Sequence, residues 1–113
     1  MPKDYNQVTE EISDSLAKLR IEAPEIMKGH SDLAVLATKD GVLDRKTKEL
    51  ISLALCIASR CDGSVLLHTQ TLIKLGVTKQ EVVEVIGIAT HMGGASSLVC
   101  ASHALKAFEQ AQS

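Results

Sequence analysis

Residues 44–68 read DRKTKELISLALCIASRCDGSVLLH, and this stretch decides how the rest of the chain must fold. Asp44 precedes a run with helical periodicity, and an aspartate in that place typically caps the first turn of a helix. The pattern predicts a helix from about Arg45 to Arg60. After Glu49 this helix is apolar nearly all round, which is typical of a helix surrounded by others. We therefore expect it to lie at the centre of the fold.

The tetrapeptide CDGS at positions 61–64 interrupts this helix. Gly63 can adopt backbone conformations that end one helix, and Asp62 or Ser64 can cap the next. We expect a short helix to follow and to reach Leu75.

Apolar residues recur at helical spacing along almost the whole chain, and no long run alternates as a half-buried strand would. Gly76 is expected to close the short helix, and Thr78 with Glu81 has the spacing of a capping box. Further helices are expected over residues 5–19, from residue 24 onward, over 78–88 and over 95–111. The sequence thus predicts an all-α fold of about six helices.

Three of these helices have one predicted apolar face each. The first two helices are expected to be peripheral and half-buried, and the last to pack its apolar stripe inward. The face of the helix over residues 5–19 consists of Val8, Ile12, Leu16 and Leu19, and that of the helix from residue 24 onward of Ile26, Met27, Leu33 and Leu36. The face of the helix over residues 95–111 consists of Leu98, Ala101, Leu105 and Phe108.

Length and composition exclude several classes of protein. The 113 residues are 45% hydrophobic, which excludes a disordered chain, and we expect one domain with peripheral helices over residues 1–40 and a core over 41–111. A net charge of -2 without charge blocks and an aromatic content of 2% argue against nucleic acid or anionic lipid as partners. The start of the chain does not resemble a signal peptide, so we expect a cytoplasmic protein with reduced thiols.

The central helices are apolar on most sides. A chain of this size cannot cover all of that apolar surface by itself. We therefore expect a homo-oligomer.

The segment from Glu49 to His68 contains the residues that could carry chemistry. A carboxylate entering a buried helix must pair, protonate or act as a proton carrier. Ser64 and His68 are four residues apart, so both side chains share one helix face. Cys61 lies at a helix junction, where backbone N–H groups can stabilise a thiolate.

These residues and their surroundings resemble the alkylhydroperoxidase D and carboxymuconolactone decarboxylase superfamily. In the redox branch of this superfamily, a Glu is followed after eleven residues by a Cys, after two further residues by a second Cys, and after three more by a His. Glu49, Cys61, Ser64 and His68 stand at those four positions. The resemblance covers roughly residues 41–108 and includes three further segments: DRKTKELI at 44–51, LGVT at 75–78 and MGG at 92–94. It implies an all-helical, alkylhydroperoxidase D-like fold assembled into trimers or hexamers.

The chain departs from the redox branch at Ser64. The resemblance implies that the attacking thiol stands at this position and that the cysteine at position 61 closes the disulfide. A serine hydroxyl cannot replace a thiolate in redox chemistry. Three explanations remain: Ser64 is natural and Cys61 works alone or with another thiol, Ser64 is an engineered change, or the chain has lost thiol chemistry.

The other thiols are interpreted as packing residues. Cys56 and Cys100 suit small buried hydrophobic positions, although Cys100 is the freer of the two to pair. Cys56 and Cys61 would point about 140° apart on a regular helix, unless the helix has already unwound between them. His30, His91 and His103 are interpreted as structural or surface residues.

No metal site and no cofactor are expected. Cys61 and His68 would supply only two good ligands, and no second Cys or His pair stands at zinc spacing. Gly93-Gly94 lacks the lysine and the preceding strand of a phosphate-binding loop.

Three functions fit the sequence. The first is a peroxidase-type antioxidant oxidoreductase, in which Cys61 reacts with a peroxide or disulfide, Glu49 and His68 relay protons, and a thiol protein supplies electrons. The second is a decarboxylase-like lyase that uses Glu49 and His68 for acid–base chemistry on a small carboxylated lactone. The third is a non-catalytic helical assembly.

Overall fold

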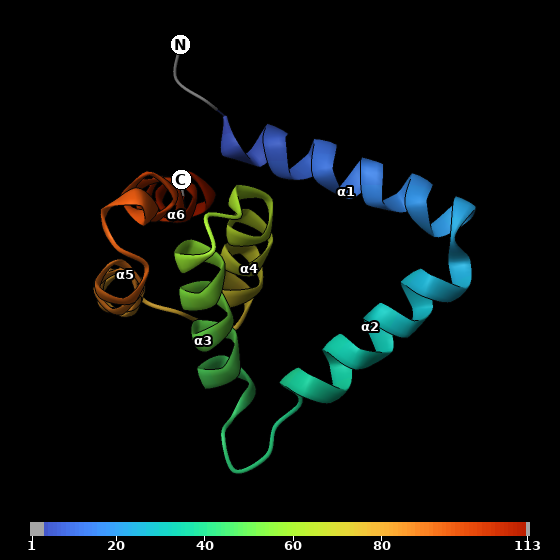
Figure 1. Cartoon of the computed structure of the whole chain (residues 1–113), viewed down its shortest axis with the longest axis horizontal. Helices are drawn as coiled ribbons and strands as arrows, with labels where there is room; N and C mark the ends of the chain where they lie inside the picture. Colours follow the sequence, from blue (N-terminus) through green and yellow to red (C-terminus); the bar gives the residue numbers. More distant parts are fainter. Residues whose placement is uncertain (1–3, 113) are drawn as a thin grey trace.

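The computed structural model describes residues 4–112, and Figure 1 shows how its helices are arranged. The described residues form six α-helices and one short 3-10 helix, with no strand. The elements are α1 (Tyr5–Glu22), α2 (Pro24–Thr38), α3 (Arg45–Ala58), α4 (Asp62–Lys74), α5 (Lys79–Gly93), η1 (Ala95–Ser97) and α6 (Leu98–Gln112). The all-α prediction is therefore confirmed for this part of the chain.

The helix α3 lies at the centre of a four-helix group. It packs against α4, α5 and α6, while α4 and α5 each also pack against α6 (Figure 1). The helices α1 and α2 form an angled arm outside this group: α1 leads away from α4 and α6, and α2 returns to the start of α3 (Figure 1). The predicted central position of the helix after Asp44 is confirmed.

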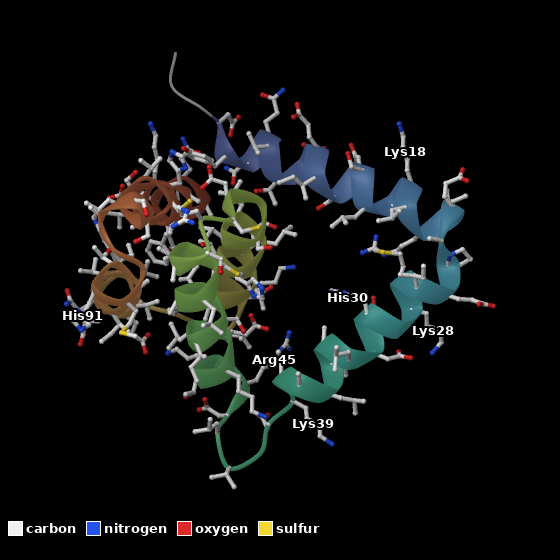
Figure 2. The ribbon with its side chains drawn as sticks, in the orientation of Figure 1. Lys18, Lys28, His30, Lys39, Arg45 and His91 are labelled. Carbon is white, nitrogen blue, oxygen red and sulfur yellow. The ribbon has the colours of Figure 1, made fainter. Side chains whose placement is uncertain are left out.

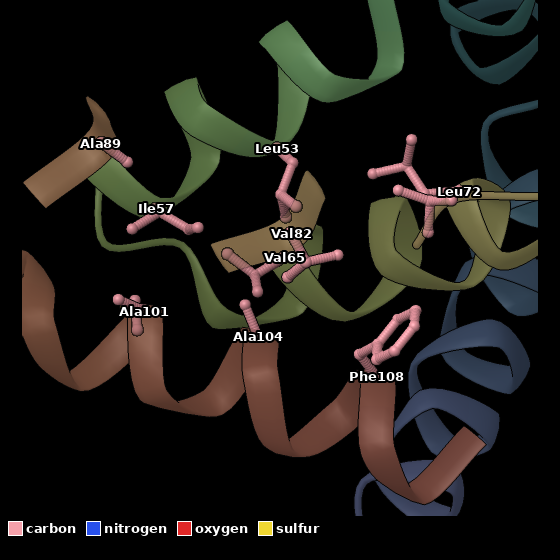
Figure 3. Close-up of a cluster of buried hydrophobic side chains, with 11 residues drawn as sticks. Leu53, Ile57, Val65, Leu72, Val82, Ala89, Ala101, Ala104 and Phe108 are labelled. Atoms are coloured by element: carbon pink, nitrogen blue, oxygen red, sulfur yellow. The ribbon is translucent and has the colours of Figure 1, made fainter. Parts of the chain in front are cut away.

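Aliphatic side chains from all four packed helices form the main core (Figure 3). Each fully buried Leu, Ile or Val contributes about 1.5–3 kcal/mol relative to an exposed one. The labelled core residues are Leu53, Ile57, Val65, Leu72, Val82, Ala89, Ala101, Ala104 and Phe108.

Several predicted helix ends are confirmed. The Asp44 carboxylate accepts a hydrogen bond from the backbone N–H of Thr47 at 2.7 Å. Thr78 and Glu81 form a capping box in which each side chain accepts from the other residue's backbone N–H. Gly76 has a φ of 82° and ends α4 in the left-handed conformation that glycine adopts without strain.

The connection between α3 and α4 differs from the prediction. The helix α3 ends at Ala58 rather than near Arg60, and Arg60 itself adopts a positive φ of 59°. Cys61 is the N-cap residue of α4, and Gly63 lies inside that helix. The prediction failed here because it assigned the left-handed position to the only glycine nearby, whereas the chain places an arginine there.

The outer helices bury less apolar surface than expected. In α1, Tyr5 and Thr9 are buried, Val8, Ile12 and Leu16 are half-buried, and Leu19 is exposed. The helix α2 buries none of its residues, and of its expected half-buried face only Met27 is half-buried, so most of that expectation is wrong within one chain. Its exposed apolar residues are Ile26, Leu33, Val35 and Leu36, and on α6 the expected inward residue Leu98 is also exposed.

No helix in residues 4–112 combines the length and the apolar character that crossing a membrane requires.

Candidate active site

The site is built around a buried carboxylate on α3. Glu49 is only 5% exposed, and its Oε2 lies 2.7 Å from Nδ1 of His68 on α4. A carboxylate that loses its water is strongly destabilised unless it gains a hydrogen-bonded or charged partner. The imidazole supplies that partner, so α3 and α4 bring together two of the candidate residues singled out from the sequence.

Cys56 belongs to the same cluster, although its sequence pattern indicated only a packing residue. It is half-buried beside the core, and its side chain interacts with the His68 imidazole. Cys56 follows Glu49 by seven residues, and this spacing places both side chains on one face of α3 two turns apart. That seven-residue spacing from Glu49 is the sequence signal that could have identified it.

The His68 imidazole is held in its protonated form. The Cys56 thiol and the Glu49 carboxylate raise the pKa of His68 to about 9, against the opposing effect of partial burial. Its side chain remains 31% exposed, so solvent or a small substrate can reach the ring. At neutral pH the site therefore contains a proton that His68 can donate.

Cys61 presents an exposed thiol at the start of α4. Its Sγ–H donates to Oγ of Ser64 at 3.2 Å. When the sulfur ionises, the Ser64 hydroxyl can donate to it instead. This hydroxyl and then the Ser64 backbone N–H lower the pKa of Cys61, and the charge of His68 adds to the effect. Burial and the neighbouring Asp62 carboxylate oppose the shift. The helix start thus stabilises the thiolate in the way a helix N-terminus stabilises anions.

One face of α4 carries all three polar residues of the site on that helix. Cys61, Ser64 and His68 are separated by three and four residues, which are the spacings of neighbours on a helix surface. Ser64 therefore lies between the exposed thiol and the imidazole. The four residues predicted from the sequence therefore lie on α3 and along the first two turns of α4, and they form two pairs in direct contact, Glu49 with His68 and Cys61 with Ser64.

Replacing Ser64 with alanine removes the hydroxyl that stabilises the Cys61 thiolate while leaving the backbone N–H in place. We expect the pKa of Cys61 to rise toward the ordinary thiol value of about 8.5 and its alkylation at neutral pH to slow. The rate of alkylation of Cys61 against pH measures the shift. An unchanged profile would show that Ser64 has no electrostatic role.

The remaining thiol and histidines take no part in the two short contacts of the site. Cys100 is only 6% exposed, and burial followed by the Asp62 carboxylate raises its pKa to about 11, which confirms its interpretation as a packing residue. His103 Nδ1 lies 2.9 Å from Asp62 Oδ2, and its ring lies against Tyr5. Exposed His30 and His91 lie on α2 and α5, the helices that carry none of the site residues (Figure 2).

A sequence model of the carboxymuconolactone decarboxylase family matches residues 24–110. The chain belongs to the carboxymuconolactone decarboxylase family. This result confirms the resemblance inferred from Glu49, Cys61, Ser64 and His68.

Two solved structures of the same family have this fold. The chain superposes on a carboxymuconolactone decarboxylase family protein from Legionella pneumophila with a TM-score of 0.90 and 51% identity, over 94% of this chain and 95% of that one. It superposes on a family protein from Thermotoga maritima with a TM-score of 0.82 and 25% identity, over 92% and 89% of the two chains. An involvement in the antioxidative response has been suggested for the Thermotoga protein.

A relative of similar length occurs in Cupriavidus necator. This uncharacterised protein is 33% identical over 109 residues, which cover 96% of each chain.

Proposed function

We propose that this carboxymuconolactone decarboxylase family member is a thiol-dependent oxidoreductase that reduces a hydroperoxide or a disulfide. Cys61 is the reacting thiol, and Glu49 and His68 handle the proton. One observation carries the proposal: an exposed thiol of lowered pKa shares a helix face with an imidazole that is protonated at neutral pH. A nucleophile and a proton donor are the two groups that cleavage of a peroxide bond requires.

The chemical roles follow from these two protonation states. The Cys61 thiolate attacks one peroxide oxygen and the O–O bond breaks, giving a sulfenic acid at Cys61 and an alkoxide. The His68 imidazolium donates its proton to the alkoxide, which leaves as an alcohol. Glu49 holds the ring in place through the 2.7 Å contact with Nδ1 and stabilises the charged imidazole before the transfer. A thiol reductant, such as a small redox protein, then returns the electrons.

The suggested antioxidative role of the Thermotoga maritima protein supports this reaction class over the others. The three thiols would stay reduced in a cytoplasmic environment, which we propose as the location.

A lyase reaction remains the second candidate because the Glu49–His68 pair could perform acid–base chemistry without a thiol. Two cationic residues lie near the motif. Arg60 donates to Ser96 at 3.0 Å, whereas Arg45 is exposed one helical turn before Glu49 on α3, so Arg45 is the residue that could hold a carboxylate substrate.

A turnover assay separates the two reactions. The purified chain is given hydrogen peroxide or cumene hydroperoxide with dithiothreitol as electron donor, and in parallel a carboxylated muconolactone. We expect protein-dependent consumption of hydroperoxide and no decarboxylation. Hydroperoxide consumption equal to that of the buffer alone would refute the proposal, and carbon dioxide release from the lactone would support the lyase.

We also propose that the chain assembles with copies of itself. The helix α2 buries no residue within one chain, although Ile26, Leu33 and Leu36 on it are apolar and between 61% and 75% exposed. An apolar groove of about 290 Å³ lies between α3 and α5, lined mainly by Leu50, Ile51, Ala54, Val85 and Ile88. Exposed apolar surface of this extent is typical of interfaces.

Multi-angle light scattering tests this assembly. We expect a mass several times the 12.1 kDa of one chain at micromolar concentration. A monomeric mass would contradict the assembly.

A further inference from the structure

The turn between α3 and α4 brings two cysteines together through the backbone. The N–H of Arg60 donates to the carbonyl of Ile57, and the N–H of Cys61 donates to the carbonyl of Cys56, each at 3.0 Å. Arg60 has the positive φ that this pattern requires. These two bonds define a Schellman motif, in which Cys56 lies in the last helical turn and Cys61 is the second residue after the C-cap Ser59.

This motif favours a contact between the side chains at these two positions. The chain contains a second example at the end of α4, where the N–H of Val77 donates to the carbonyl of Leu72 at 3.0 Å and Gly76 takes the positive φ. Leu72 and Val77 are both buried members of the same core cluster. Cys56 and Cys61 occupy the equivalent two positions in the first motif.

The backbone geometry meets the distance requirement of a disulfide. The 3.0 Å hydrogen bond connects the two residues. Covalent bonds of about 1.2–1.5 Å, which meet at bent angles, connect the atoms of this hydrogen bond to the Cα atoms of Cys56 and Cys61. The two Cα atoms therefore lie within the distance of about 7 Å that a disulfide requires. The two side chains were expected to point apart unless the helix unwinds between them, and α3 does end between them, at Ala58.

The surroundings of the two thiols differ in a way that assigns them different roles. Cys61 is exposed at the start of α4, where a substrate reaches it first. Cys56 is half-buried and interacts with the His68 imidazole, which is paired with Glu49. The proton-transferring pair therefore serves the less accessible thiol directly.

We propose that Cys56 and Cys61 form a reversible disulfide, in which Cys61 is oxidised first and Cys56 is the resolving thiol. This inference rests on the proposed thiol chemistry and supplies the second sulfur that Ser64 lacks. The pair is separated by four residues in the sequence, instead of the two residues that separate positions 61 and 64.

The reaction balances with a hydroperoxide as oxidant and a dithiol as reductant. After the first step Cys61 is a sulfenic acid and His68 is neutral. His68 takes the proton of the Cys56 thiol, the Cys56 thiolate attacks the Cys61 sulfur, the S–O bond breaks, and the leaving hydroxide takes that proton and departs as water. The dithiol then reduces the disulfide, and its two protons return to Cys56 and His68.

The tryptic map of this chain makes the disulfide easy to detect. Cleavage after Lys48, Arg60, Lys74, Lys79 and Lys106 places the three cysteines in three separate peptides: residues 49–60, 61–74 and 80–106. We would oxidise the protein with one equivalent of hydrogen peroxide, block free thiols with N-ethylmaleimide and digest without reduction. The expected product is peptide 49–60 linked to peptide 61–74, and this link disappears after treatment with dithiothreitol.

Diamide oxidation makes the pairing test independent of peroxide chemistry, because diamide joins neighbouring thiols directly. A 49–60/61–74 link with diamide, together with no hydroperoxide consumption, would support the pair and refute the proposed function. Hydroperoxide consumption without this link, or with peptide 61–74 linked to 80–106, would refute the pair and leave the proposed function standing.

Two variants add a kinetic readout. In Cys56→Ser the Cys61 sulfenic acid has no resolving thiol, so its capture by dimedone on peptide 61–74 is expected to rise about tenfold. Cys100→Ala removes a buried core thiol that has no role in the proposed pair and is expected to behave like the unmodified protein. Equal dimedone labelling of Cys56→Ser and the unmodified protein would overturn the resolving role, provided that circular dichroism shows both folded.

Discussion

Replacing Cys61 with serine is expected to reduce hydroperoxide turnover to the uncatalysed rate. The Cys61 thiol is exposed, and its pKa is lowered by Ser64, so it is the thiolate that a substrate meets first. A serine hydroxyl stays protonated at neutral pH and its oxygen cannot accept the peroxide oxygen, so neither attack nor oxidation can occur. Steady-state consumption of cumene hydroperoxide with dithiothreitol measures the effect.

The matched control is Cys100→Ala, which also removes one thiol but from a site that is only 6% exposed. It is expected to keep the turnover of the unmodified chain. Residual activity in Cys61→Ser close to that of this control would show that another thiol, or no thiol, performs the reaction.

Replacing His68 with glutamine is expected to lower turnover about 100-fold, the usual contribution of a positioned general acid or base, and replacing Glu49 with glutamine is expected to lower it less. The Cys56 thiol and Glu49 together raise the pKa of His68 to about 9, so His68 carries its proton at neutral pH. Without the carboxylate that pKa falls, and fewer molecules hold the proton that the leaving alkoxide needs. The alkaline limb of the pH–rate profile is therefore expected to move to lower pH in Glu49→Gln.

The same pair also couples stability to pH. The pKa of His68 is raised in the folded chain from 6.5 to about 9, so the stabilisation is fully present below pH 6.5 and is lost as the pH rises through about 9. Urea unfolding at about pH 6 and about pH 10 is expected to show a drop in the free energy of unfolding that is smaller in Glu49→Gln. Unchanged turnover and an unchanged pH profile in both variants would remove the pair from the mechanism.

Local sequence patterns predicted most of the helical framework because they report local physics. The capping box at Thr78 and Glu81 and the N-cap at Asp44 satisfy backbone groups within one turn, so neighbouring residues determine them. The turn after α3 was harder to predict, because a positive φ at Arg60 is stabilised by the surrounding fold and has no residue signature. The exposure of α2 also depends on the surrounding fold. An apolar helix face does not specify whether the residues that pack against it belong to the same chain.

The site was predicted in part. The spacing of Ser64 and His68 on one helix face is a local property. The need of a buried carboxylate for a partner could be predicted for Glu49, but the sequence did not identify His68 as that partner. Cys56 was missed because its partner is on another helix and because its distance from Cys61 depends on where α3 ends. A helix that continued to Arg60 would have directed the two thiols apart.

The rate of alkylation of Cys61 against pH tests the central claim most directly. Iodoacetamide labelling followed by mass spectrometry of peptide 61–74 isolates this thiol from Cys56 and Cys100. The structure predicts an apparent pKa clearly below the free value of about 8.5, because Ser64 and His68 stabilise the thiolate. An apparent pKa at or above about 8.5 would contradict the account and leave Cys61 as an unreactive thiol at a helix junction.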